Sequence, residues 1–123
     1  MFRIKFYEDK NGDTPIADYI KDLRKKAVSN KNERVRLKKI TEYMRVLRKY
    51  GTRAGEPYVK HIDGKIWELR PTNDRMFFFA IEDGVFIMLH HFTKKTQKTP
   101  SREIEQAKRN MEDFLKRRPK DEQ

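Results

Sequence analysis

Two apolar segments joined by a tight turn place the strongest constraint on how this chain can fold. Residues 75–82 contain three consecutive phenylalanines, an Asp-Gly pair at 83–84 favours a turn, and residues 85–92 are again almost continuously apolar. Strands of this composition are typical of the centre of a sheet that is covered on both sides. We therefore expect a central β-hairpin with helices on at least one face of the sheet.

The remaining elements follow from the spacing of apolar residues and from turn signals. Residues 2–6 alternate apolar and basic side chains, as half-buried strands do. Thr14-Pro15 begins a stretch with helical periodicity, Gly51 ends a second one, and Thr99-Pro100 begins a third. The sequence thus predicts strands at 2–6, 59–62, 66–70, 75–82 and 85–92, and helices at 15–27, at 31–50 and after residue 100.

This order of elements predicts an α+β fold. It comprises a small, twisted antiparallel sheet with an N-terminal helical pair and a C-terminal helix. The 123 residues and the mass of 15.0 kDa fit one domain, which we expect at 1–118, followed by a flexible tail at 119–123.

Alternation along the third predicted strand assigns its side chains to two faces. Trp67 and Leu69 share one face and are the expected core pair, so Glu68 and Arg70 point to the opposite face, which we expect to be open for binding. Taken alone, Glu68 and Arg70 favour the alternative of a cross-strand salt-bridge pair on a solvated face. Arg75 begins the next strand, however, and two arginines at one pocket repel each other unless an anion lies between them.

A histidine and lysine run follows the last predicted strand. His90 and His91 point to opposite faces, so at most one of them shares a cleft with Lys94. Histidine is the usual proton-transfer group near neutral pH, although a histidine at a strand end is more often a hydrogen-bonded structural residue. Lys94 and Lys95 are the candidate cations of this run.

The positive charge of the chain is concentrated in its first half. The formal net charge is +11, and residues 20–60 carry fourteen basic and four acidic side chains, which accounts for most of the excess. Such a surface attracts phosphate groups or an acidic protein that imitates them. A merely solvated helix face is the alternative interpretation.

Several classes of function are excluded by what the sequence lacks. The chain has no cysteine, which rules out disulfides, thiol catalysis and cysteine-based metal sites. It has no glycine-rich nucleotide-binding loop, no Gly-x-Ser-x-Gly nucleophile motif and no histidine or carboxylate spacing typical of a metal site. No apolar run is long enough to span a bilayer and no signal peptide is evident, so we expect a cytoplasmic protein without a cofactor or a metal.

Together these motifs resemble the phage-derived, HigB-like branch of the RelE/ParE toxin superfamily. The resemblance covers nearly the whole chain. It is carried by Glu-Leu-Arg at 68–70, by Arg75, by Leu-His-x-Phe-x-Lys-Lys-Thr-x-Lys-Thr-Pro at 89–100 and by Glu-Ile at 103–104. One departure is His91, where relatives commonly carry a small residue such as glycine. Its bulk either narrows the local surface or points into solvent.

The resemblance implies the toxin of a type II toxin–antitoxin system, a ribosome-dependent mRNA endoribonuclease. Such a toxin inhibits translation by metal-independent cleavage that uses the 2′-hydroxyl of the RNA. The resemblance also implies a helix-turn-helix, HigA-like antitoxin, through which alone the toxin would contact operator DNA. The implied partners are thus this antitoxin, the ribosome and mRNA, with no membrane.

Cationic side chains can stabilise the phosphorane formed in such a cleavage, and Glu68, His90 or a lysine can move the proton. The expected catalytic residues are Arg70, Arg75, Lys94, Lys95, Glu68 and His90, and those expected to bind the ribosome and RNA are Lys38, Lys39, Arg45, Arg48 and Lys49. Two other functions stay open: a ParE-like inhibitor of gyrase and a non-catalytic RNA-binding module. Glu68, the two arginines and the double lysine favour the nuclease.

Overall fold

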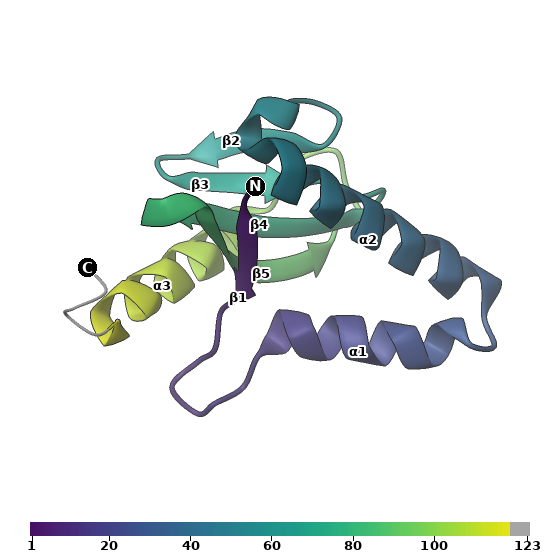
Figure 1. The fold of residues 1–123 in the computed structure, drawn as a ribbon. Coiled ribbons are helices and arrows are strands. Elements are labelled where there is room, and N and C mark those ends of the chain that lie inside the picture. Colours follow the sequence, from purple (N-terminus) through teal and green to yellow (C-terminus); the bar gives the residue numbers. More distant parts are fainter. Residues whose placement is uncertain (119–123) are drawn as a thin grey trace.

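In the computed structural model, which describes residues 1–118, helices cover both faces of a five-stranded sheet (Figure 1). The strand order across the sheet is β1-β5-β4-β3-β2. The strands are β1 Arg3–Phe6, β2 Val59–Asp63, β3 Ile66–Leu69, β4 Asp74–Ile81 and β5 Val85–Thr93. The helices are α1 Pro15–Ala27, α2 Lys31–Tyr50 and α3 Ser101–Arg117, with short 3₁₀ turns η1 Gly51–Ala54 and η2 Glu82–Gly84.

The sheet is antiparallel from β2 to β5, as the sequence predicts, but its edge strand β1 is parallel to β5. In this pairing Ile4 lies opposite Phe86. The expectation of a wholly antiparallel sheet is therefore wrong for one strand. Alternation within β1 identifies its buried face, but the direction of pairing depends on the path of the chain through α1, α2 and the β2–β5 meander.

Each face of the sheet has its own apolar core. On one face Leu69, Phe78 and Met88 pack with side chains of α1 and α2, and on the other Phe77, Phe79 and Ile87 pack with α3. The central strands β4 and β5 are thus covered on both sides, as their composition predicts. The fold is α+β with the RelE-like arrangement of an N-terminal helical pair, a mostly antiparallel sheet and a C-terminal helix.

The faces of β3 are assigned correctly, but one of them is not open. Leu69 is fully buried and Trp67 is half-buried against the core under α1 and α2. Glu68, on the opposite face, is only 1% exposed. The expectation that it lies on an open face is wrong, because that face carries the second core and is covered by α3. Period-two alternation distinguishes the two faces without showing which of them is covered.

The helix boundaries agree closely with the predicted ones. Pro15 is the first residue of α1, and Gly51, with φ of 64°, follows the last residue of α2. The N-cap of α2 is Asn30, whose side chain accepts a hydrogen bond from the Glu33 backbone. Thr99 is not the cap of α3, because Pro100 occupies that position. The predicted tail at 119–123 lies outside the described residues.

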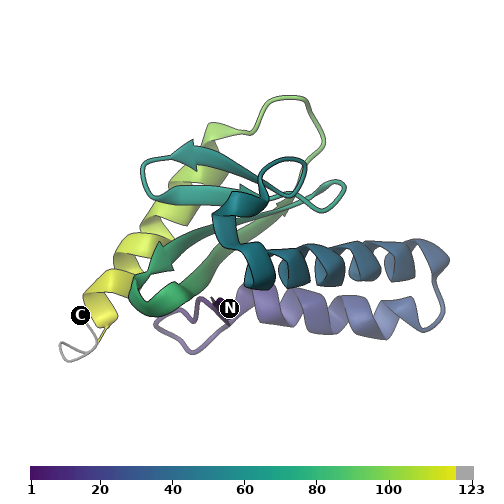
Figure 2. The same cartoon turned by 45° about the horizontal axis from the view of Figure 1, so that its top comes forward.

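The helical pair forms an arm beside the sheet. Figure 2 shows α1 and α2 running side by side and antiparallel, with the connection between them extending beyond the strands. No helix within residues 1–118 combines the length and the apolar character needed to cross a membrane.

Candidate functional site

The ends of three neighbouring strands form a basic pocket. Arg70 follows the last residue of β3, Arg75 is the second residue of β4, and Lys94 follows the last residue of β5. Antiparallel pairing places these three positions at the same end of the sheet, and Arg75 lies opposite Phe92 of β5. The resulting pocket has a volume of about 780 Å³ and is lined by Arg70, Asn73, Arg75, Thr93, Lys94, Lys95, Thr96 and Gln97.

A buried carboxylate lies beneath the two arginines. Oε1 of Glu68 is 3.2 Å from Nε of Arg70 and 3.7 Å from Nε of Arg75. Burial raises the pKa of Glu68 above its ordinary value, and the positive charges of Arg75, Arg70 and Lys94 oppose that shift. Glu68 thus supplies the negative charge that allows two guanidinium groups to share one site.

This cluster is held by charge more than by hydrogen bonds. Within residues 1–118, Oε2 of Glu68 and the Nε atoms of Arg70 and Arg75 are buried and make no hydrogen bond of good geometry. Buried polar atoms without hydrogen-bond partners are uncommon in native structures. The cluster of Glu68, Arg70 and Arg75 under the pocket is therefore unusual, because it combines buried charges with buried polar atoms that lack hydrogen-bond partners.

The two arginines differ in how they are held. The Arg75 guanidinium donates hydrogen bonds through Nη1 to the carbonyls of Thr72 and Asp74, the second at 3.0 Å. Burial lowers the pKa of Arg75, although Glu68 opposes that shift, and a guanidinium remains charged at any physiological pH. Arg70 is more exposed, and its Nη1 donates to the carboxylate of Glu56 at 3.0 Å. Arg75 is thus fixed by backbone, and Arg70 by side chains alone.

The histidines are not part of this pocket. Nε2 of His90 lies 2.8 Å from the carboxylate of Glu103 in the first turn of α3, and His90 lines a different pocket between β5 and α3. His91 faces α1 and is hydrogen-bonded to Asp74 at 2.9 Å. Its side chain is only 12% exposed, so the interpretation that it points into solvent is wrong. It lines the same pocket as His90, so the interpretation that its bulk narrows the local surface stays a prediction. The structure thus separates both histidines from Lys94 and Lys95.

The basic residues predicted on α2 are exposed and lie apart from the pocket lining. Two of them have local partners: Lys39 lies 3.8 Å from the carboxylate of Glu42, and Lys49 lies over the ring of Tyr50 at 5.4 Å. The exposed cations of this face, which we call the α2 basic face, are Lys38, Lys39, Arg45, Arg48 and Lys49.

Sequence reasoning missed three polar residues around the pocket. Asn73 lines it, Glu56 binds Arg70, and Asp74 accepts a side-chain hydrogen bond from Arg36 of α2. Asn73 and Asp74 belong to a segment that resembles an ordinary turn, and Glu56 lies in an irregular connection. Because these contacts join residues far apart in the chain, no local spacing signals them.

Comparison with known families assigns the chain. The model of the family described as "Phage derived protein Gp49-like (DUF891)" matches residues 18–112, from α1 to α3. The chain belongs to the Gp49-like family. The match covers the whole basic pocket and the α2 basic face, so the Gp49-like assignment rests on the segment that contains the candidate site. A comparison with curated proteins found no match.

Proposed function

We propose that this Gp49-like protein is the toxin of a type II toxin–antitoxin system and cleaves mRNA on the ribosome. Gp49-like proteins are grouped with the HigB-like toxins of the RelE/ParE superfamily, and the arrangement of the elements is RelE-like. The observation that carries the proposal is the basic pocket, which is lined by four cations, two of them paired with one buried carboxylate. The cations are Arg70, Arg75, Lys94 and Lys95, and the carboxylate beneath the two arginines is that of Glu68.

The chemistry proposed for the basic pocket is an intramolecular transfer within the RNA. The 2′-hydroxyl loses its proton to water and its oxygen attacks the adjacent phosphorus. The bond from phosphorus to the 5′-oxygen breaks, and an ammonium group of Lys94 or Lys95 donates a proton to the departing oxygen. The products are a 2′,3′-cyclic phosphate and a 5′-hydroxyl. Positive charge fixed around the phosphorane stabilises the transition state, and the two arginines provide it.

Neither Glu68 nor His90 takes the proton-transfer role expected from the sequence. At 1% exposure, Glu68 does not reach the RNA in this conformation, so we assign it to holding Arg70 and Arg75 beside each other. His90 lies outside the pocket and is paired with Glu103, so it takes no part in the proposed proton transfer.

The α2 basic face provides the proposed contact with the ribosome. Its cations are exposed along α2, one of the two helices of the arm. Such a surface binds RNA phosphates without reading sequence, and its affinity falls with increasing salt. A helix-turn-helix antitoxin that inhibits the toxin completes the proposed system.

Replacing Arg70 with alanine tests this function. Arg70→Ala removes one transition-state cation, so cleavage of ribosome-bound mRNA should fall about 10²–10³-fold. Because Arg70 also pairs with Glu56 and with the buried Glu68, the rate is compared per folded protein, with the folded fraction measured by circular dichroism at the assay temperature. Arg102→Ala, which removes an exposed arginine on α3, is the matched control and should cleave at the wild-type rate.

Two results would contradict the proposal. If the Arg70 variant cleaves ribosome-bound mRNA as fast as wild type, the cleavage site lies elsewhere. If wild type never cuts mRNA on ribosomes while supercoiling by gyrase falls in its presence, the protein is a gyrase inhibitor and the nuclease assignment is wrong.

A further inference from the structure

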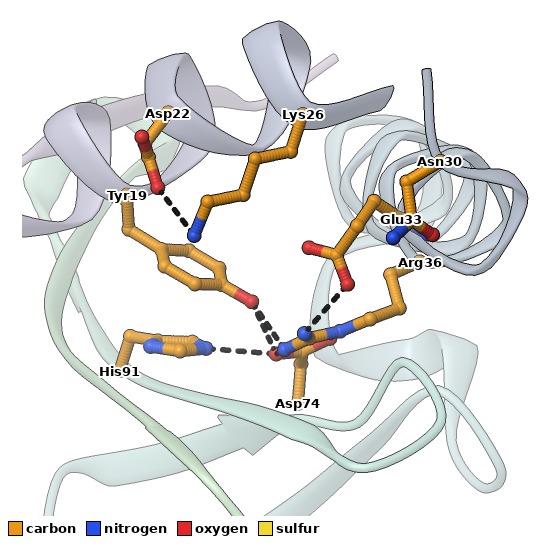
Figure 3. A network of polar contacts seen from close by, with 8 residues as sticks. All are labelled: Tyr19, Asp22, Lys26, Asn30, Glu33, Arg36, Asp74 and His91. Atoms are coloured by element: carbon orange, nitrogen blue, oxygen red, sulfur yellow. Dashed lines mark hydrogen bonds and ion pairs between the residues drawn. The ribbon is translucent and has the colours of Figure 1, made fainter. Parts of the chain in front are cut away.

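A second buried carboxylate lies directly beside the basic pocket. Asp74, the first residue of β4, has no exposed surface, and side chains from three other elements converge on it (Figure 3). Tyr19 comes from α1, Arg36 from α2 and His91 from β5. The helical arm and the sheet therefore meet at one carboxylate.

Within residues 1–118, the polar contacts of the Asp74 carboxylate are hydrogen bonds that it accepts. Oδ1 receives the Tyr19 hydroxyl at 2.8 Å, Nη2 of Arg36 at 2.8 Å and Nε2 of His91 at 2.9 Å. Oδ2 receives Nε of Arg36 at 3.3 Å. Because an ionised carboxylate only accepts hydrogen bonds, the proton of His91 in this contact lies on Nε2.

The donors of this network are themselves fixed. The rings of Tyr19 and His91 are stacked with centroids 3.9 Å apart. The Tyr19 hydroxyl, which donates to Asp74, accepts a hydrogen bond from Arg36, and Arg36 also lies 3.4 Å from the carboxylate of Glu33. Burial alone would raise the pKa of Asp74, but the hydrogen bonds from His91, Arg36 and Tyr19 outweigh it and lower that pKa to about 2. The Asp74 carboxylate is thus ionised at all physiological pH values.

The backbone around Asp74 forms one wall of the pocket. Its two neighbours in the chain, Asn73 and Arg75, both line the pocket. The Asn73 carbonyl accepts a hydrogen bond from the Lys94 backbone at 2.7 Å, and the Asp74 carbonyl accepts one from the Arg75 guanidinium. A displacement of Asp74 therefore moves a carbonyl that binds the Arg75 guanidinium and a neighbouring carbonyl that binds the backbone of Lys94.

The turn before Asp74 needs such an anchor. Thr72 has φ of 48°, in the left-handed region that β-branched residues rarely adopt. Residues in such conformations persist only where surrounding contacts fix them. The carbonyl of this same residue accepts a hydrogen bond from Arg75, so the turn that orients the guanidinium is held in an unfavourable backbone conformation.

We propose that Asp74 is a positioning residue for Arg75, and that its carboxylate, held by Tyr19, Arg36 and His91, ties the helical arm to the cleavage pocket. The carboxylate fixes the backbone carbonyls of the turn, and these carbonyls direct the guanidinium. This inference rests on the proposed function, because it concerns the same reaction. Asp74 determines the position of the Arg75 guanidinium, so it affects the cleavage step. It leaves the binding of RNA by the α2 basic face unchanged.

Tyr19→Phe is the variant that tests this role. Phenylalanine keeps the ring stacked on His91 and removes one hydrogen bond to Asp74. Misplacing a positioned group by about 1 Å can cost as much as ~10²-fold in rate, and a partial loss of the anchor should lower kcat about tenfold with KM unchanged. The side-chain Nε–Hε resonance of Arg75 should shift in the NMR spectrum of the same variant. Tyr50→Phe, which removes an exposed hydroxyl at the end of α2, should change neither measurement.

Asp74→Asn is the second, larger test. It should lower kcat further than Tyr19→Phe, beyond any loss of folded protein measured by circular dichroism at the assay temperature. If Tyr19→Phe keeps the wild-type kcat and an unshifted Arg75 resonance, or if both variants lose activity only in proportion to the folded fraction, the positioning role is overturned.

Failure of the proposed function would be recognised separately. If wild type does not cleave ribosome-bound mRNA, the nuclease assignment fails and the Arg75 resonance alone decides the inference. A shift in Tyr19→Phe that is absent in Tyr50→Phe supports positioning, and an unshifted resonance overturns it.

Discussion

Asp74 and Glu68 are both fully buried carboxylates beside arginines, yet their environments shift their pKa values in opposite directions. Burial raises the pKa of Glu68, whereas three hydrogen-bond donors outweigh burial at Asp74 and lower its pKa to about 2. The two residues lie on neighbouring strands and on opposite faces of the sheet, Glu68 on the side of α3 and Asp74 on the side of the helical arm.

The difference lies in hydrogen bonding rather than in the presence of positive charge. The arginines near Glu68 approach at 3.2 and 3.7 Å without good hydrogen-bond geometry, whereas Asp74 accepts well-directed hydrogen bonds at 2.8 and 2.9 Å. A nearby charge offsets only part of the cost of burying a carboxylate, and directed donors offset the rest. The hydrogen bonds of Asp74 therefore fix the position of its carboxylate. The weaker contacts of Glu68 leave the charge of Arg70 and Arg75 available to a ligand in the pocket.

Replacing Asp74 with asparagine should have the largest effect on stability. The variant leaves Arg36 without its buried counter-ion, and the loss of one partner of such a pair costs about 3–5 kcal/mol when both partners are buried. Because Arg36 is partly exposed and can rehydrate, we expect a loss near the lower end, about 3 kcal/mol, in urea unfolding at pH 7. A loss below about 1 kcal/mol would show that the network is not a structural anchor.

The ionisation of Asp74 should make the free energy of unfolding of the wild-type protein fall at low pH. Its pKa is about 2 in the folded chain and near 3.8 when unfolded, so the unfolded state binds the proton more tightly. This residue thus contributes about 2 kcal/mol that is fully present above about pH 5 and is lost progressively as the pH falls through 2. Urea unfolding between pH 2 and pH 5 checks this, and Asp74→Asn should lack that part of the slope.

Glu68→Gln should have a smaller effect and the opposite pH dependence. The folded pKa of Glu68 is raised, so its ionisation costs stability, and that cost appears as the pH rises through the raised value. At pH 7 glutamine avoids the cost of burying a charge but gives up the attraction to the two arginines, and we expect a net change below about 1 kcal/mol. Urea unfolding from pH 4 to pH 7 would contradict this account if the two proteins showed identical slopes.

The pocket was more predictable than its surroundings. Alternation and the antiparallel order were enough to place Arg70 and Arg75 at one end of the sheet, and the lysine run after the last strand adds Lys94 and Lys95 to the same end. These are local properties of consecutive strands, which is why spacing along the chain indicates them.

The features of the site that the sequence did not predict depend on contacts between segments that are distant in the chain. The burial of Glu68 follows from the packing of α3, and the separation of His90 from the pocket follows from its partner Glu103 on the same helix. In the Asp74 network, Arg36 lies 38 positions and Tyr19 lies 55 positions before Asp74 in the chain. No local pattern distinguishes an aspartate in a turn from one that anchors three other elements.

The chemistry of the ends of the cleaved RNA tests the central claim most directly. Wild-type protein should cut ribosome-bound mRNA to leave a 2′,3′-cyclic phosphate and a 5′-hydroxyl, because positive charge in the pocket assists attack by the 2′-hydroxyl. A single 2′-deoxy substitution at the cleaved nucleotide should abolish that cut while leaving binding to the ribosome intact. Fragments with 5′-phosphate ends, or cleavage at the 2′-deoxy position, would contradict the account.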